Sequence, residues 1–202
     1  MKLSFEFGNG VQEVELPSRN LIGELHANDV PIGLRGEAEV VRALRDPIGS
    51  QRLRDIVRPG ETVAIVTSDL TRPMPTALVM PALLDELYAG GVRPEDITLV
   101  FALGCHRPQT EAERKKLAGE RAFREIRCVD SDPTDCISYG LTSRGTPVDI
   151  TRAVAEADRR ICLGNIEYHY FAGYSGGAKA IMPGVSTREA IQANHSRMVL
   201  PE

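Results

Sequence analysis

Hydrophobic residues in this chain follow two kinds of pattern, which alternate along it. Short, continuous apolar runs rich in β-branched residues occupy residues 63–67, 97–103 and 159–165, and such runs are typical of strands buried on both faces of a sheet. Residues 124–130 (REIRCVD) add a less apolar strand. Longer stretches with helical spacing separate these runs. Strands and helices that alternate in this way predict an α/β fold built on a parallel sheet with flanking helices.

Start and stop signals indicate where the expected helices lie. Residues 36–46 have apolar positions at helical spacing, and residues 76–91 form a longer helix that ends at two glycines. Thr110 and Ser186 are each followed three residues later by a glutamate, the spacing of a capping box, and each is expected to open a helix. Residues 148–159 read as a further short helix.

The first residues of the chain alternate between polar and apolar at period two. Residues 2–7 and 11–16 flank Gly8, Asn9 and Gly10, which predicts a β-hairpin whose turn has Asn9 and Gly10 available for positive φ. Alternation of this kind lacks the continuous apolar core of a signal peptide.

Composition narrows the class of protein further. The chain has 202 residues, of which 42% are hydrophobic and 26% charged, as in ordinary globular proteins. Its net charge is −4 with lysine and arginine scattered, so no nucleic-acid partner is expected. No segment approaches the roughly 18 apolar residues of a membrane span. The four cysteines form no CxxC pair, and we therefore expect a cytoplasmic protein.

Chemically capable residues collect where the three apolar runs end. The segments that follow the runs are TSDLTRP (residues 67–73), GCHRP (104–108) and GNIEYHYFAGYSGGAK (164–179). In an open parallel sheet, ligands bind outside the carboxyl ends of the strands. The pattern therefore predicts one cleft, lined by Asp69, Arg72, His106, His169 and Lys179.

Each of these residues also has a purely structural interpretation. Asp69 could cap a helix, His169 could be packed among aromatic residues, and the Lys179 side chain could simply be exposed to solvent. His195, on the expected last helix, could be an ordinary surface histidine. Three of the four histidines nevertheless fall in or just after these loops, which favours a functional site. Cys105 is expected to be a small packed residue rather than a nucleophile.

Taken together, SDLTRP, GCHRP, EYHYFAGYSGGAK with the following IMPG, and Asn194-His195 resemble the nickel-pincer-dependent lactate racemase family. Order and spacing agree from about residue 63 to 195. The resemblance implies that the fold is Rossmann-like, that residues 1–202 form the N-terminal cofactor-binding domain with its β-hairpin, and that a second α/β domain is missing from this sequence.

The resemblance also implies roles for individual residues. Lys179 matches the lysine that forms a thioamide bond to the cofactor, Ni(II)-pyridinium-3,5-bisthiocarboxylate mononucleotide, and His195 matches the histidine that ligates nickel. His106 and His169 match the pair of acid–base histidines. The segment Asp69, Leu70, Thr71 and Arg72 matches the residues that contact the cofactor.

The activity implied is racemisation or epimerisation of a small 2-hydroxy acid of the lactate type by hydride relay. Cofactor-synthesis proteins are implied as partners, and protein made without them is expected to lack the cofactor. Without the missing C-terminal domain, the fragment alone is expected to be inactive. Two alternatives stay open: a zinc-type metallohydrolase that uses His106, His169 and His195, and a non-catalytic nickel or nucleotide binding module.

Overall fold

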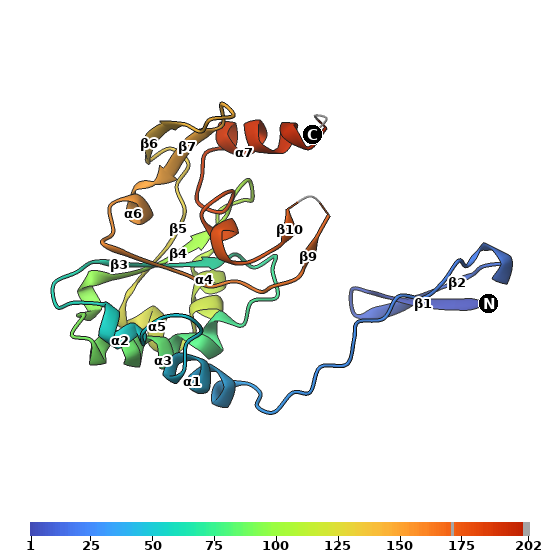
Figure 1. Cartoon of the computed structure of the whole chain (residues 1–202), viewed down its shortest axis with the longest axis horizontal. Coiled ribbons are helices and arrows are strands. Elements are labelled where there is room, and N and C mark those ends of the chain that lie inside the picture. Colours follow the sequence, from blue (N-terminus) through green and yellow to red (C-terminus); the bar gives the residue numbers. More distant parts are fainter. Residues whose placement is uncertain (171, 200–202) are drawn as a thin grey trace. The chain divides into compact units, whose positions relative to one another are not determined.

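The computed structural model describes residues 1–170 and 172–199 (Figure 1). It divides into two compact units, Met1–Gly33 and Leu34–Glu202. Within the first unit, the antiparallel strands β1 (Lys2–Phe7) and β2 (Gly10–Glu15) confirm the predicted hairpin. Positive φ was expected at Asn9 and Gly10, but in this turn it occurs at Gly8 (φ 60°).

A four-stranded parallel sheet forms the centre of the second unit. Its strands are β3 (Val63–Ser68), β4 (Ile97–Ala102), β5 (Arg127–Asp130) and β8 (Arg159–Cys162), in the spatial order β5-β4-β3-β8. The chain builds outward from β3 to β5 and then returns to the other side of β3. This order is that of a doubly wound Rossmann-like sheet, and it places the switch point between β3 and β8. The predicted fold class is confirmed.

Alternate residues of the central strands pack on opposite faces of the sheet. Val63 and Ile65 of β3 belong to one hydrophobic cluster, whereas Ala64 and Val66 belong to the other. Because both faces are covered, the strands need apolar residues at every position, which is the reason for the continuous runs in the sequence.

Helices cover one face of the sheet, and a smaller mixed layer covers the other (Figure 1). The helices are α1 (Glu37–Arg45), α2 (Leu53–Ile56), α3 (Thr76–Ala89), α4 (Glu111–Ala118) and α5 (Glu120–Glu125). The mixed layer contains the antiparallel pair β6 (Cys136–Leu141) and β7 (Pro147–Thr151), the short helix α6 (Arg152–Ala155) and Val185. No helix among the described residues is both long enough and apolar enough to span a bilayer.

Two predictions about local structure were wrong. In the helix expected over residues 148–159, residues 148–151 belong to strand β7, because Val148 and Ile150 alternate and pack on the sheet. Only the single turn α6 is helical. The last helix, α7 (Arg188–His195), is capped by Thr187, whose hydroxyl accepts the Ala190 N–H at 3.2 Å. The Ser186 hydroxyl instead donates to the Ile181 carbonyl. The capping box predicted at Thr110 is confirmed.

Candidate functional site

The loops after β3, β4 and β8 surround a pocket of about 290 Å³ at the carboxyl ends of these strands. This edge is where an open α/β sheet binds its ligands, and the pocket includes the switch point between β3 and β8. Residues from η3 (Gly177–Ala180) and α7 complete the wall. The polar and charged side chains that line the pocket are Ser68, Asp69, Arg72, Cys105, His106, Asn165, Ser175, Lys179 and His195.

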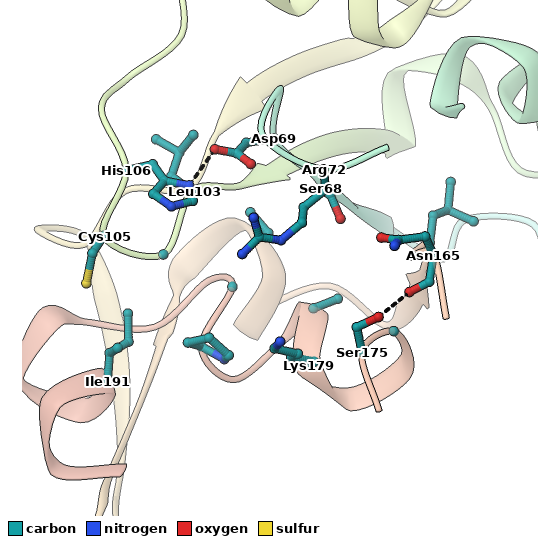
Figure 2. A pocket seen from close by; sticks show the side chains of 18 of the residues that line it. Ser68, Asp69, Arg72, Leu103, Cys105, His106, Asn165, Ser175, Lys179 and Ile191 are labelled. Atoms are coloured by element: carbon teal, nitrogen blue, oxygen red, sulfur yellow. Dashed lines mark hydrogen bonds and ion pairs between the residues drawn. The ribbon is translucent and has the colours of Figure 1, made fainter. Parts of the chain in front are cut away.

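Asp69 and His106 form a hydrogen-bonded pair at one side of the pocket (Figure 2). His106 Nδ1 lies 2.7 Å from Asp69 Oδ2, and the carboxylate is 4% exposed whereas the imidazole is 44% exposed. Asp69 Oδ1 accepts two further hydrogen bonds, from the Thr71 N–H at 3.2 Å and the Thr71 hydroxyl at 2.7 Å. The carboxylate is therefore held from both sides while the ring reaches the pocket.

Gln109 fixes the backbone of the loop that carries Asp69. Its side-chain carbonyl accepts the Leu70 N–H at 3.1 Å, and its amide group donates to Asp130 Oδ1 at 2.9 Å. The Gln109 N–H donates to Asp130 Oδ2 at 2.8 Å, and Gln109 is buried. Since Asp130 ends β5, the sheet itself anchors the loop after β3.

Lys179 enters the pocket from a tightly folded glycine loop. Strands β9 (Tyr168–His169) and β10 (Gly173–Tyr174) pair in this loop, and Ser175 closes it by donating from its hydroxyl to the Asn165 carbonyl at 2.7 Å. Gly176 has φ 81° and ψ −176°, a conformation open essentially to glycine alone. A Cβ at Gly176 would also lie 3.2 Å from the Asn165 carbonyl oxygen. The two glycines before the lysine therefore allow the turn that brings Lys179 to the pocket.

Positive charges gather around Lys179 and His169. Burial, with Arg72 adding to it, lowers the pKa of Lys179 below 10.5. Burial also lowers the pKa of His169, and the charges of Lys179, Arg72 and His195 act in the same direction. Figure 2 shows Arg72 extending between the Asp69–His106 pair and Lys179. The site is thus rich in cations and suited to a ligand that carries negative charge.

Most of the predicted site residues meet at this pocket. Asp69, Arg72, His106, Lys179 and His195 line it. His169 does not belong to its wall, but its pKa responds to three residues that do. Leu70 and Thr71 also lie outside the wall, and Thr71 acts within the loop by donating to Asp69.

Sequence reasoning placed one residue wrongly and passed over two others. Cys105 was expected to be packed but is exposed and lines the pocket, because Gly104 (φ 57°) turns the chain out of β4. Ser68 and Asn165 also line the pocket and were not singled out. Their positions next to Asp69 and Gly164, directly after two buried strands, were the only signal in the sequence.

A metal site made of three histidines does not form. Among residues 1–170 and 172–199, no three His, Cys, Asp or Glu side chains converge on a point where they could hold a metal ion. His106 Nδ1 is directed at Asp69, and His169 is absent from the wall that His106 and His195 share. This arrangement opposes the zinc alternative, which needs at least three protein ligands.

Residues 7–202 match the model of the lactate racemase N-terminal domain. The chain belongs to this family. The match includes every pocket residue described above, so the predicted family is confirmed.

Two curated relatives are both named lactate racemase. The protein from Thermoanaerobacterium thermosaccharolyticum is 33% identical over 198 residues, which cover 96% of this chain and 46% of the relative. The protein from Lactiplantibacillus plantarum is 36% identical over 167 residues, which cover 81% of this chain and 39% of the relative. The chain therefore spans less than half the length of either relative.

Solved structures give the same assignment of fold. The lactate racemase apoprotein from T. thermosaccharolyticum matches with a TM-score of 0.80 and 32% identity, over 96% of this chain and 46% of that one. A protein from Thermotoga maritima matches with a TM-score of 0.63 and 24% identity, over 81% of this chain and 41% of that one, which supports the fold alone.

Proposed function

We propose that residues 1–202 form the cofactor-holding N-terminal domain of a racemase that acts on a small 2-hydroxy acid such as lactate. Membership of the lactate racemase family supports this proposal. The observation that carries it is that one pocket gathers an amine, a guanidinium and two imidazoles, from Lys179, Arg72, His106 and His195.

The residues present fit the nickel-pincer nucleotide that the resemblance implies. Lys179 offers an amine in the pocket whose lowered pKa makes the neutral, nucleophilic form easier to reach than in an exposed lysine, and a covalent tether forms from that form. His195 offers a nitrogen donor of the kind that nickel accepts. A pincer that brings its own carbon and sulfur donors needs only one protein ligand, so the lack of a three-residue cluster among the described residues is compatible with it.

When bound, this group would supply an acceptor for the hydride that leaves the substrate carbon. The chain's own residues would handle protons and charge. His106 would take the proton of the substrate hydroxyl at Nε2, since Nδ1 is engaged with Asp69. His169 would do the same for the opposite enantiomer, and its lowered pKa keeps the ring neutral and able to accept a proton.

Arg72 would hold negative charge in the pocket, either that of a substrate carboxylate or that of the cofactor. It makes no ion pair with any residue in the described part of the chain, and its side chain extends into the pocket (Figure 2). Hydride transfer also requires exclusion of water, for which we propose that a C-terminal domain covers the open side.

The test is to express the chain together with the cofactor-synthesis proteins of a lactate-racemising bacterium. We expect an intact-mass adduct on Lys179 and bound nickel, and neither in Lys179→Arg. Expression without those proteins should yield the unmodified mass. Conversion of L-lactate into D-lactate by the complete enzyme would establish racemisation. An adduct and nickel without racemisation would favour a non-catalytic binding module, and zinc without an adduct would contradict the proposal.

A further inference from the structure

We propose that Asp69 is a positioning residue that fixes the tautomer of His106, so that the proton sits on Nδ1 and the lone pair of Nε2 is available in the pocket. The resemblance assigned Asp69 to cofactor contact, whereas the geometry points to His106 as its partner. The inference deepens the proposed function, since it rests on His106 being an acid–base group.

The hydrogen bonds of Asp69 support this role. Its Oδ2 lies 2.7 Å from His106 Nδ1, the distance of a charge-assisted hydrogen bond. An ionised carboxylate only accepts hydrogen bonds, so the ring must place its proton on Nδ1. The neutral imidazole carries one proton, which leaves Nε2 as the acceptor. Nε2 is then the atom of His106 that can receive a proton from a ligand.

The other oxygen of Asp69 is engaged in its own loop. Oδ1 accepts the N–H and the hydroxyl of Thr71, and the residue as a whole is only 3% exposed. A ligand in the pocket would therefore find little of this carboxylate to contact. The Thr71 hydroxyl, which donates to Asp69, also lies 3.4 Å from His106 Nδ1 and offers that N–H a weaker second acceptor.

The surrounding structure holds this pair rigidly. The Leu70 N–H donates to Gln109, which is in turn held by Asp130 at the end of β5. Asp69 follows β3, His106 follows β4 and Asp130 ends β5. The pair is thus attached to three consecutive strands of the sheet, with β4 in the middle. A support of this kind is what a precisely oriented acid–base group requires.

The chain contains a matched control for the Asp69 loop. Asp132 Oδ1 accepts the Thr134 N–H at 2.8 Å and the Thr134 hydroxyl at 2.6 Å, the same local motif as Asp69 with Thr71. No histidine is among its hydrogen-bond or ion-pair partners in the described residues. Asp132→Asn therefore removes the charge and perturbs the turn without affecting a histidine.

The decisive measurement is the long-range ¹H–¹⁵N correlation spectrum of the histidine rings in this chain, at a pH where the rings are neutral. His106 is assigned from its loss in His106→Gln. We expect a protonated Nδ1 and an unprotonated Nε2 in the natural chain and in Asp132→Asn. Asp69→Asn should give a mixed or reversed tautomer, because an amide can donate as well as accept.

A proton on Nε2 in the natural chain would overturn the proposal, and so would an unchanged tautomer in Asp69→Asn. If Asp69→Asn fails to fold, the tautomer of the natural chain still decides. Neither measurement depends on racemisation, so a confirmed tautomer together with no racemisation by the complete, cofactor-loaded enzyme would refute the proposed function alone. In a cofactor-loaded complete enzyme, Asp69→Asn should lower kcat by about 10²–10⁴-fold with little change in KM or in the Lys179 adduct.

Discussion

His106 and His169 stand in different electrostatic surroundings although both are candidate acid–base residues. His106 faces the buried carboxylate of Asp69, whereas His169 lies within reach of the positive charges of Lys179, Arg72 and His195. Under the proposed function each histidine would act as the base for one enantiomer, and the two rings are supported in unlike ways. The difference is a property of single residues and can be tested one residue at a time.

Replacing Lys179 by methionine should raise the pKa of His169. Burial is the largest cause of the lowered pKa and would remain, but the ammonium of Lys179, which contributes most among the neighbouring charges, would be gone. The measurement is an NMR titration of the His169 ring in both proteins. Lys116→Met, which removes an exposed lysine of α4, serves as the control and should leave this pKa unchanged. A lower pKa of His169 in Lys179→Met would contradict the electrostatic account.

The residues of the site could be predicted from the sequence, but their pairing could not. Asp69 and His106 are 37 positions apart, and they meet because Ser68 pairs in register with Ala102 on the neighbouring strand. No local pattern encodes that register. The cofactor contact expected of Asp69 came from the family resemblance, and nothing in the sequence indicated its hydrogen bond to His106.

At the scale of elements, the turn that brings Lys179 to the pocket depends on the backbone conformations of Gly176 and Gly177. Gly176→Ala should lower the free energy of unfolding by about 2–3 kcal/mol, since its φ and ψ lie in a region that alanine avoids and its Cβ would crowd the Asn165 carbonyl. Gly177→Ala is the matched control. Its φ of 53° is left-handed but its Cβ would meet nothing within 4 Å, so we expect a loss of only about 1 kcal/mol. Urea unfolding measures both, and equal losses would refute the role of crowding.

Helices α2 and α3 are joined by a buried carboxylate. Glu86 on α3 is 5% exposed, and its Oε1 lies 2.5 Å from Arg52 Nη2 and 2.6 Å from Arg54 Nη2. Burial acts to raise the pKa of Glu86, but the two guanidiniums outweigh it and lower the pKa below 4.5. The ionised form is therefore the one that stabilises the fold.

Glu86→Ala should lower the free energy of unfolding by about 2–3 kcal/mol at neutral pH, because both arginines lose their partner. Glu39→Ala, which removes the exposed pair with Arg42 on α1, should change the stability far less, because solvent screens that pair. The stabilisation by Glu86 is complete above its ordinary pKa and is lost as the pH falls through the lowered one. Unfolding curves of the natural chain and Glu86→Ala should therefore converge below pH 4.5, and a difference that grows in acid would contradict this.

Elements buried on both sides were easier to predict than those at the edge. Strands β3 and β4 contribute to both hydrophobic clusters, and their continuous apolar runs have no other interpretation. Strand β7 packs on the sheet with one side only, so its apolar residues alternate with polar ones. Since α6 follows directly, the apolar positions of the two elements together have the spacing of a single helix. The cap of α7 was misplaced by one residue because Ser186 and Thr187 can both cap, and the Ile181 carbonyl engages Ser186.

At the scale of the whole molecule, the two units differ in how much they bury. No residue of Met1–Gly33 is buried, whereas every buried residue belongs to Leu34–Glu202. A two-stranded hairpin is at best marginally stable by itself. The second unit contains both hydrophobic clusters and the whole pocket, so it has what an independently folding unit requires.

A variant that comprises residues 34–202 should therefore unfold cooperatively with nearly the same stability as the full chain. We expect a loss of at most about 1 kcal/mol, equivalent to about 2–4 °C in Tm, because the described core residues all lie within residues 34–202. Leu87→Ala in the full chain gives the loss of stability expected when a core side chain is truncated. This side chain is 0% exposed, and its truncation should cost about 2–5 kcal/mol. A deletion variant as unstable as Leu87→Ala, or one that unfolds without cooperativity, would mean that residues 1–33 are part of the folding unit. The ring spectra of His106 should also be the same in the shortened and the full chain, since the site is built entirely from residues after Gly33.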